Sequence, residues 1–204
     1  MTIKELYDKV YTAGETKSPE AFIRLYEENT FLIENQEITT DENHEAVMRL
    51  TADYAHHLVT KESYLKALTY LDKAIVLFEN YNGFDLSKMN DVDFYRILRF
   101  DRGVANFELR NYSKSHYDFK WLMKNNPDNE TFRNWSNAIV YRKIQIQIRF
   151  LWYLLAGLLI LEIFIDRTTF NILHTTVLIL CSLSLLSILF LEAIKYKNKR
   201  KTYN

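Results

Sequence analysis

The stretch YAHHLVTKESYLKALTYLDKAIVL, residues 54–77, decides the fold. Small residues at Ala55, Ala67 and Ala74 recur among larger apolar residues, on both sides of a polar KES sequence. Apolar residues three or four positions apart share one face of a helix, so the pattern predicts two helices separated by a turn at 61–63.

A second copy of this pattern occurs in RGVANFELRNYSKSHYDF, residues 102–119. The matching pairs are Ala55 with Gly103, Tyr64 with Tyr112, Ala67 with Ser115, and Leu71 with Phe119, all 48 residues apart (115 − 67). The offsets resemble the tetratricopeptide repeat, in which small residues let two helices approach and aromatic residues fill the gap. NNPDN, 125–129, falls where that family carries its terminal proline. The family repeat is about 34 residues long, and a longer helix at 42–60 and linker at 80–91 fit the difference.

The resemblance implies a binding module rather than an enzyme. An earlier, degenerate copy fits SPEAFIRLYEEN, residues 18–29, with Ala21 and Leu25. On the family's pattern, first-helix residues line a groove that binds a peptide or protein partner. Those residues are Arg49, His56, Val59, Phe100, Val104 and Phe107.

The remaining sequence also favours helices. Four glycines and two prolines are too few for a loop-rich β protein. Ser18-Pro19 and Thr39-Thr40-Asp41 are helix-opening sequences. We expect an all-α fold: a cytoplasmic domain of tetratricopeptide-like antiparallel helix pairs at 1–143, followed by a transmembrane helical hairpin.

The hairpin is predicted from FLWYLLAGLLILEIFI, 150–165, and FNILHTTVLILCSLSLLSILFLEAI, 170–194. A membrane-spanning helix needs about 17–25 mostly apolar residues. With the preceding IQIQI, the expected spans are 147–165 and 170–194 within a hairpin at 144–194, and a helix that begins near Asn129 should run directly into the first span. The alternative is a helix pair buried in a soluble protein, which is disfavoured because so long a core helix rarely lacks a polar face.

Flanking charges predict the orientation. Basic residues precede the first span and follow the second, in a tail at 195–204, so the positive-inside rule places both termini in the cytoplasm, at the inner membrane in a bacterium. The turn at 166–169 then faces outward, and MTIKELYDKV has no apolar stretch that would act as a signal peptide. Residues 96–143 hold ten basic and five acidic residues, which suits anionic lipid headgroups. A nucleic-acid surface is disfavoured because the rest of the domain is acidic.

Polar residues within the spans suggest helix packing. Glu162, His174 and Glu192 lie near span ends, where they can reach an interface. Small and hydroxyl residues let helices approach closely in lipid. The expected packing residues are Ala156, Gly157, Ser182, Ser184 and Ser187. They fit either packing between the two spans or formation of a homo-oligomer.

Two short constellations raise the question of catalysis or metal binding. In LRNYSKSH, 109–116, Arg110, Asn111 and His116 have the spacing of the HEPN ribonuclease motif (116 − 110 = 6). That resemblance implies proton transfer by His116 and charge stabilisation by Arg110 across a dimer. The alternative is an inter-helix turn at Arg110 and Asn111, with His116 just after a packing residue.

Asp53 and His57 share a helix face beside His56, which suits metal binding, but a site needs a third and usually a fourth ligand and only His44 is near in sequence. A solvent-facing Asp/His pair is therefore the favoured interpretation. Phosphate-binding glycine loops, serine-nucleophile motifs and HExxH are absent, and the one cysteine, Cys181, lies in the second span. We therefore expect no enzyme, no metal and no cofactor.

The sequence favours a membrane-anchored adaptor that recruits a protein partner. The first alternative is an oligomeric membrane-perturbing or channel-forming effector, such as those of bacterial phage defence, gated by the cytoplasmic domain. The second alternative is a membrane-tethered HEPN-like ribonuclease.

Overall fold

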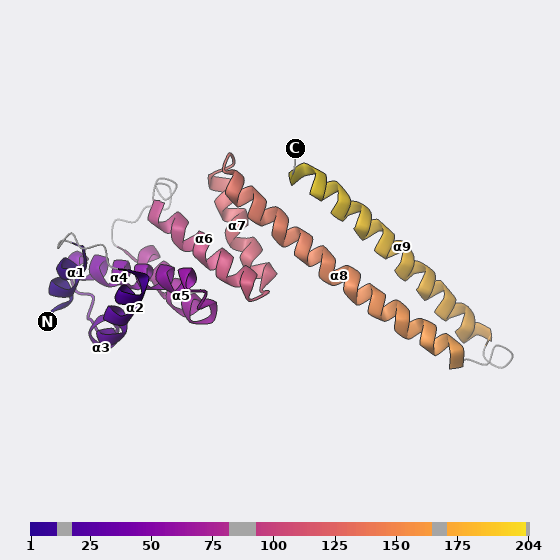
Figure 1. Ribbon diagram of the computed structural model, residues 1–204, viewed down its shortest axis with the longest axis horizontal. Helices are drawn as coiled ribbons and strands as arrows, with labels where there is room; N and C mark the ends of the chain where they lie inside the picture. The colour runs from indigo at the N-terminus through magenta and orange to yellow at the C-terminus, as the bar shows by residue number, and fades with distance from the viewer. Residues whose placement is uncertain (12–17, 82–92, 165–170, 203–204) are drawn as a thin grey trace. The chain divides into compact units, whose positions relative to one another are not determined.

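The computed structural model describes residues 1–11, 18–81, 93–164 and 171–202, and these residues are helical apart from short connections (Figure 1). The helices in this part of the chain are α1 (Ile3–Tyr11), α2 (Pro19–Glu28), α3 (Thr30–Glu34), α4 (Asp41–Thr60), α5 (Tyr64–Glu79), α6 (Asp93–Glu108), α7 (Tyr112–Asn125), α8 (Glu130–Phe164) and α9 (Asn171–Thr202). No strand occurs among them, which confirms the all-α prediction. The predicted turn at 166–169 and most of the predicted linker at 80–91 lie outside the described residues.

The chain divides into two compact units, residues 1–132 and 133–204. The predicted boundary at residue 143 lies within α8, which begins at Glu130 and continues without interruption to Phe164. The predicted helix running from near Asn129 into the apolar segment is thereby confirmed. The basic tail predicted at 195–204 also begins within a helix, since α9 extends to Thr202.

Two successive helix pairs form most of the first unit. The helices α4 and α5 pack antiparallel, as do α6 and α7, and α5 contacts α6 (Figure 1). Ala55, Ala67 and Leu71 are fully buried in the first pair. In the second pair, the Ser115 hydroxyl donates to the Gly103 carbonyl at 2.8 Å. The predicted small positions are therefore points of close helix approach.

The turns within the two pairs have the same backbone geometry. Glu62 (φ 59°) and Arg110 (φ 62°) are the non-glycine residues with positive φ in the described chain, and they are 48 residues apart (110 − 62). After each, a backbone N–H donates to a carbonyl five residues back, from Ser63 to Leu58 at 2.9 Å and from Asn111 to Asn106 at 2.7 Å. This left-handed helix ending satisfies carbonyls that the helix leaves unpaired. The two helix pairs therefore repeat each other in turn conformation as well as in sequence.

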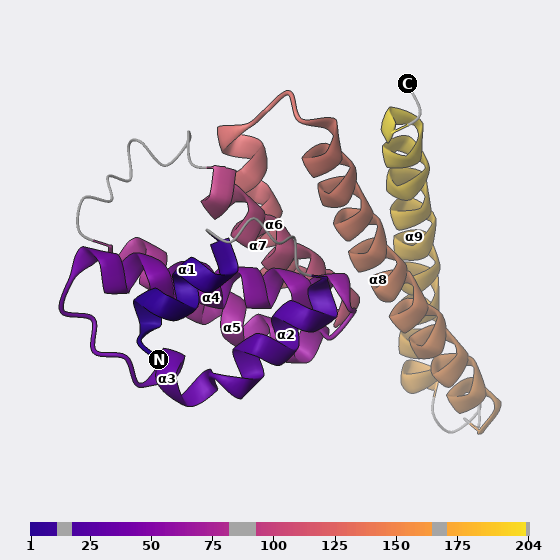
Figure 2. The ribbon, with the colours of Figure 1, turned by 60° about the vertical axis from the view of Figure 1, so that its left-hand side comes forward.

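The N-terminal helices cover part of α4. Both α1 and α2 contact it (Figure 2). Tyr26 of α2 stacks on Tyr54 of α4 with ring centroids 4.0 Å apart. Ala21 is exposed, and the buried residues of α2 are Phe22 and Tyr26, whereas Leu25 is only partly buried. Each buried position thus lies one residue after the position predicted from the degenerate copy.

The second unit is an antiparallel pair formed by α8 and α9 (Figure 1). Its buried centre consists of Ile144, Ile148, Leu155 and Ile188. Both helices are long and apolar enough to cross a membrane, yet only 17% and 22% of their most apolar windows are buried. Most of their leucine, isoleucine and phenylalanine side chains are exposed.

Candidate partner-binding surface and polar network

The predicted groove residues of α4 have different environments. The Arg49 guanidinium lies over the rings of Tyr11 and Phe94, 5.6 and 5.7 Å from their centroids. Val59 packs against the buried core. His56 is exposed and faces α6. Arg49 and His56 are therefore the α4 members that a partner can reach.

The predicted groove residues of α6 are half-buried. The Phe100 ring lies 5.7 Å from Phe119 and 5.9 Å from Phe132, measured between centroids. Phe107 packs 5.4 Å from Tyr112, and Val104 is half-buried. Much of the surface of Phe100 and Phe107 is therefore covered by neighbouring aromatic rings.

Sequence reasoning missed the most accessible apolar residue of this α6 face. Ile97 is 46% exposed. It precedes Val104 by two helical turns, so both share a face of α6. The signal that could have identified Ile97 is its spacing of three residues from the predicted Phe100 and seven from Val104.

A hydrogen-bonded ion pair links the two first helices. His56 Nδ1 of α4 lies 2.7 Å from Asp101 Oδ2 of α6, and the Asp101 side chain is only 6% exposed. The hydrogen bond to Asp101 raises the pKa of His56, against the opposing effect of partial burial. Burial raises the pKa of Asp101, and His56 counteracts that rise. The pair therefore links α4 to α6.

The HEPN-like residues lie where the turn interpretation places them. Arg110 and Asn111 form the turn between α6 and α7, and the positive φ of Arg110 belongs to the helix ending. His116 is half-buried and follows the fully buried Ser115. The turn geometry accounts for the backbone at Arg110 without any role in phosphate chemistry.

The residues considered for metal binding have separate partners. The Tyr11 hydroxyl donates to Asp53, and the His57 ring packs 4.9 Å from Phe22. His44 Nε2 lies 2.7 Å from the Leu77 carbonyl oxygen. In the described ranges no three histidine, cysteine, aspartate or glutamate side chains gather closely enough to hold a metal ion.

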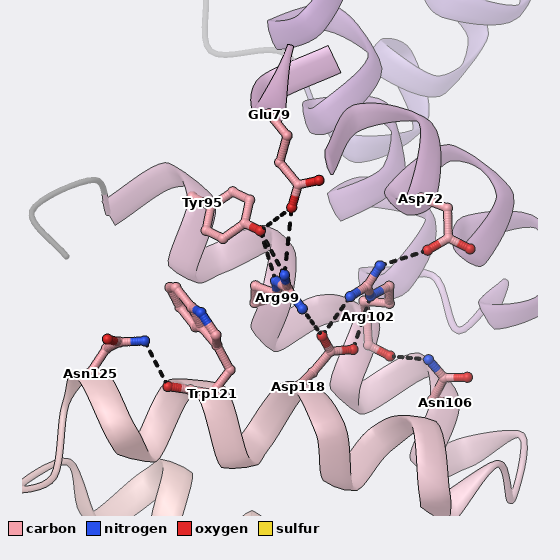
Figure 3. Close-up of polar contacts among 9 residues, drawn as sticks. All are labelled: Asp72, Glu79, Tyr95, Arg99, Arg102, Asn106, Asp118, Trp121 and Asn125. Atoms are coloured by element: carbon pink, nitrogen blue, oxygen red, sulfur yellow. Dashed lines mark hydrogen bonds and ion pairs between the residues drawn. The ribbon is translucent and has the colours of Figure 1, made fainter. Parts of the chain in front are cut away.

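A buried polar network joins α5, α6 and α7 (Figure 3). Arg99 Nη1 donates to Asp118 Oδ1 at 2.9 Å, and both side chains are nearly inaccessible, at 8% and 2% exposure. Arg102 donates to both Asp118 oxygens, at 2.7 and 2.9 Å, and to Asp72 at 2.8 Å. One carboxylate on α7 is thus held by two arginines of α6.

Aromatic rings enclose the Arg99 guanidinium. Its central carbon lies 5.2, 5.5 and 5.4 Å from the ring centroids of Tyr95, Tyr117 and Trp121. The Tyr95 hydroxyl accepts from Arg99 at 2.7 Å and donates to Glu79 at 2.6 Å. Burial and the bond to Glu79 raise the pKa of Tyr95 to about 12. These contacts keep Arg99 charged and hydrogen-bonded inside the domain.

The network explains part of the basic excess at 96–143. Arg99 and Arg102 are committed to Asp118, and Arg96 donates to Asn126 at 2.8 Å. Their charges therefore stabilise the α6–α7 pair instead of facing lipid headgroups. The signal that could have revealed this is the i, i+4 spacing of Tyr95 and Arg99 on one helix, matched by an aspartate on the next.

The predicted packing residues of the hairpin lie mostly on its outside. Ala156 and Gly157 are exposed, and a Cβ added to Gly157 would have no neighbour within 4 Å. Ser184 is buried, whereas Ser182 and Ser187 are exposed. All three hydroxyls donate to the carbonyl four residues earlier in α9. Within one chain, only Ser184 lies between the helices.

One ion pair lies inside the hairpin. Glu162 of α8 contacts His174 Nδ1 of α9, and their side chains are 12% and 18% exposed. The sequence places both residues near the ends of the predicted spans but does not show that they pair. A one-turn shift of either helix would separate them, so the register of the hairpin brings them together.

No family model, curated protein or solved structure matches this chain.

Proposed function

We propose that this protein is a membrane-anchored adaptor. In this proposal the tetratricopeptide-like unit lies in the cytoplasm and binds a protein or peptide partner, and the apolar hairpin holds the complex at the membrane. The observation that carries the anchor is the outward-facing apolar surface of α8 and α9. A soluble core helix would bury that surface, and lipid is the solvent in which exposing it costs least.

The binding role is supported by the repeated helix pairs of the first unit. Stacked helix pairs present a continuous face formed by their first helices. Here that face carries accessible Arg49, His56 and Ile97. Tethering would raise the local concentration of a bound partner near the membrane, so moderate affinity suffices for recruitment.

Alkaline carbonate extraction tests the anchor. We expect the full-length protein to stay in the membrane pellet, and recovery in the carbonate supernatant would contradict the anchor. A cysteine-free background with one cysteine introduced at residue 168 tests orientation. Labelling of that cysteine by an impermeant reagent only from outside the cell is expected.

Site-specific photo-crosslinking tests the binding surface. A photoreactive residue at Ile97, on α6, is expected to capture one discrete partner in membranes. The matched control is Val76 on α5, which is 54% exposed and lies on a second helix. Identical adducts from both positions, or an Ile97 adduct that excess unmodified protein does not compete away, would contradict a specific surface.

A second candidate function is an oligomeric membrane effector. It is favoured by the outward position of Gly157, Ser182 and Ser187, where they are free to pack against another copy. We expect Ser182→Leu/Ser187→Leu to lower the oligomer size in mild detergent and to abolish dye leakage from vesicles. Leakage by neither the native protein nor the variant leaves the adaptor as the better proposal.

A further inference from the structure

An open surface cavity of 330 Å³ lies at the end of the hairpin where the apolar run of α8 begins and that of α9 ends. It is lined by Gln145, Ile148, Arg149, Trp152, Tyr153 and Lys195. Arg149 precedes the apolar run of α8, and Lys195 follows the apolar run of α9. Two cations that are 46 residues apart in sequence (195 − 149) therefore share one cavity, at the level where the apolar surface ends.

The charge around this cavity is unbalanced. Arg149 makes no ion pair within the described residues. Lys195 pairs with Glu192 at 3.0 Å and lies 5.7 Å from the centre of the Tyr141 ring. Arg142 donates to the lining residue Gln145 at 3.3 Å. Of the two lining cations, Lys195 is paired with Glu192 and Arg149 has no ion-pair partner among the described residues, so the cavity carries net positive charge and attracts an anion.

The aromatic residues place this cavity at the membrane surface. Trp152 and Tyr153 are 51% and 71% exposed. Such amphipathic rings concentrate at the boundary between hydrocarbon and headgroups. A cavity at that depth faces phosphate groups, and a guanidinium binds phosphate oxygens through two parallel hydrogen bonds.

We infer that this cavity binds the phosphate of an anionic phospholipid headgroup. Arg149 supplies the hydrogen-bonding fork, Lys195 supplies a second charge, and Trp152 packs against the glycerol region. A zwitterionic headgroup carries its own cation, which Arg149 and Lys195 repel. The inference rests on the proposed membrane insertion.

Native mass spectrometry of the full-length protein in mild detergent tests the inference. With equal amounts of phosphatidylglycerol and phosphatidylcholine, the native protein is expected to retain phosphatidylglycerol preferentially. Removing one cation should weaken that retention about 5-fold, and Arg149→Gln/Lys195→Gln should weaken it about 30-fold. Arg149→Lys/Lys195→Arg keeps both charges and should retain the preference.

The control variant is Arg133→Gln/Lys143→Gln, which removes two charges from α8 outside the cavity. Equal loss of lipid in this control and in Arg149→Gln/Lys195→Gln would overturn the inference, as would equal retention of both lipids by the native protein. Displacement of the lipid by excess inorganic phosphate identifies phosphate itself as the ligand, whereas persistence of the lipid identifies the intact lipid. Carbonate extraction reports separately on insertion, so the two proposals fail in distinguishable ways.

Discussion

At the scale of single residues, Asp118 is the most consequential charge in the first unit. It accepts hydrogen bonds from Arg99 and Arg102 and is 2% exposed. Removing one partner of a buried pair leaves the other charge uncompensated, which typically costs about 3–5 kcal/mol. We expect Asp118→Ala to lower the free energy of unfolding by about 3 kcal/mol, because Arg99 keeps Tyr95 as a partner.

Asp72→Ala is the matched control for this change. Asp72 also binds Arg102, at 2.8 Å, but its side chain is 63% exposed. Exposed ion pairs contribute at most about 1 kcal/mol. Denaturant unfolding of the full-length protein in mild detergent measures both variants. Equal effects would show that burial of Asp118 does not determine its contribution.

His56 should make stability depend on pH. Because Asp101 raises the folded-state pKa of His56, the protonated pair stabilises the folded protein. This contribution is fully present below the unfolded histidine pKa of about 6.5 and is lost as pH rises through the higher folded value. Since the side chain is 47% exposed, we expect less than about 1 kcal/mol.

The measurement is the difference in unfolding free energy between the native protein and His56→Gln, taken from below the unfolded histidine pKa to above the folded one. The difference should be largest at about pH 6 and should shrink as pH rises. Glutamine is chosen because its side-chain amide can still donate a hydrogen bond to the buried Asp101 carboxylate. A difference that grows with pH would contradict the assigned direction of the His56 pKa shift.

At the scale of elements, the backbone conformation of the turn between α6 and α7 is expected to lower the stability of the protein. Arg110 has a left-handed φ of 62°, which costs an L-residue about 1–2 kcal/mol, part of which glycine recovers. We expect Arg110→Gly to stabilise the protein by about 0.5–1 kcal/mol, with Glu62→Gly acting similarly. Lys120→Gly, within α7, should instead destabilise by about 1 kcal/mol. A fall in thermal midpoint for Arg110→Gly would indicate that the Arg110 side chain has a structural role.

The close approach of α6 and α7 depends on Gly103. A Cβ at this position would lie 2.7 Å from Phe119 Cε2. We expect Gly103→Ala to destabilise the protein by about 1–2 kcal/mol, because the buried ring has to shift. The other helix pair has Ala55 and Leu71 at the equivalent positions.

The first pair thus combines alanine with leucine where the second combines glycine with phenylalanine, which suggests a test of the Gly103 prediction. Phe119→Leu should relieve the clash, so a double-mutant cycle of Gly103→Ala and Phe119→Leu should give a favourable coupling of about 1 kcal/mol. Additive effects would mean that Gly103 is required for another reason.

The helices and the small packing positions could be predicted from the sequence, because they follow from the spacing of apolar and small residues along the chain. Ala55, Ser115 and the polar turns needed no knowledge of distant contacts. The network around Arg99 and the pairing of Glu162 with His174 could not be predicted, because each depends on which faces of separate helices meet. Ile97 could have been predicted, because its spacing from Phe100 and Val104 places it on the same face of the helix.

At the scale of the whole molecule, the two units bury their apolar residues differently. The first unit has a continuous core from α1 to α6. The second has a narrow seam around Ile148 and Ile188, with most apolar side chains outside it. The first unit thus buries most of its apolar side chains within itself, whereas the second leaves most of its own exposed.

A charge introduced at an exposed position of α9 should therefore show whether that position contacts water or lipid. Leu183 lies near the middle of the apolar part of α9 and is 55% exposed. In water, lysine at such a position should change stability by less than about 0.5 kcal/mol. In lipid, it should cost about 2.5–3.5 kcal/mol of insertion free energy. We expect Leu183→Lys to reduce the carbonate-resistant fraction strongly, whereas Leu65→Lys, at a 75% exposed position of α5, should leave it unchanged. Full membrane retention and unchanged stability of Leu183→Lys would mean that this face of α9 contacts water, and the proposed anchor would then have to be abandoned.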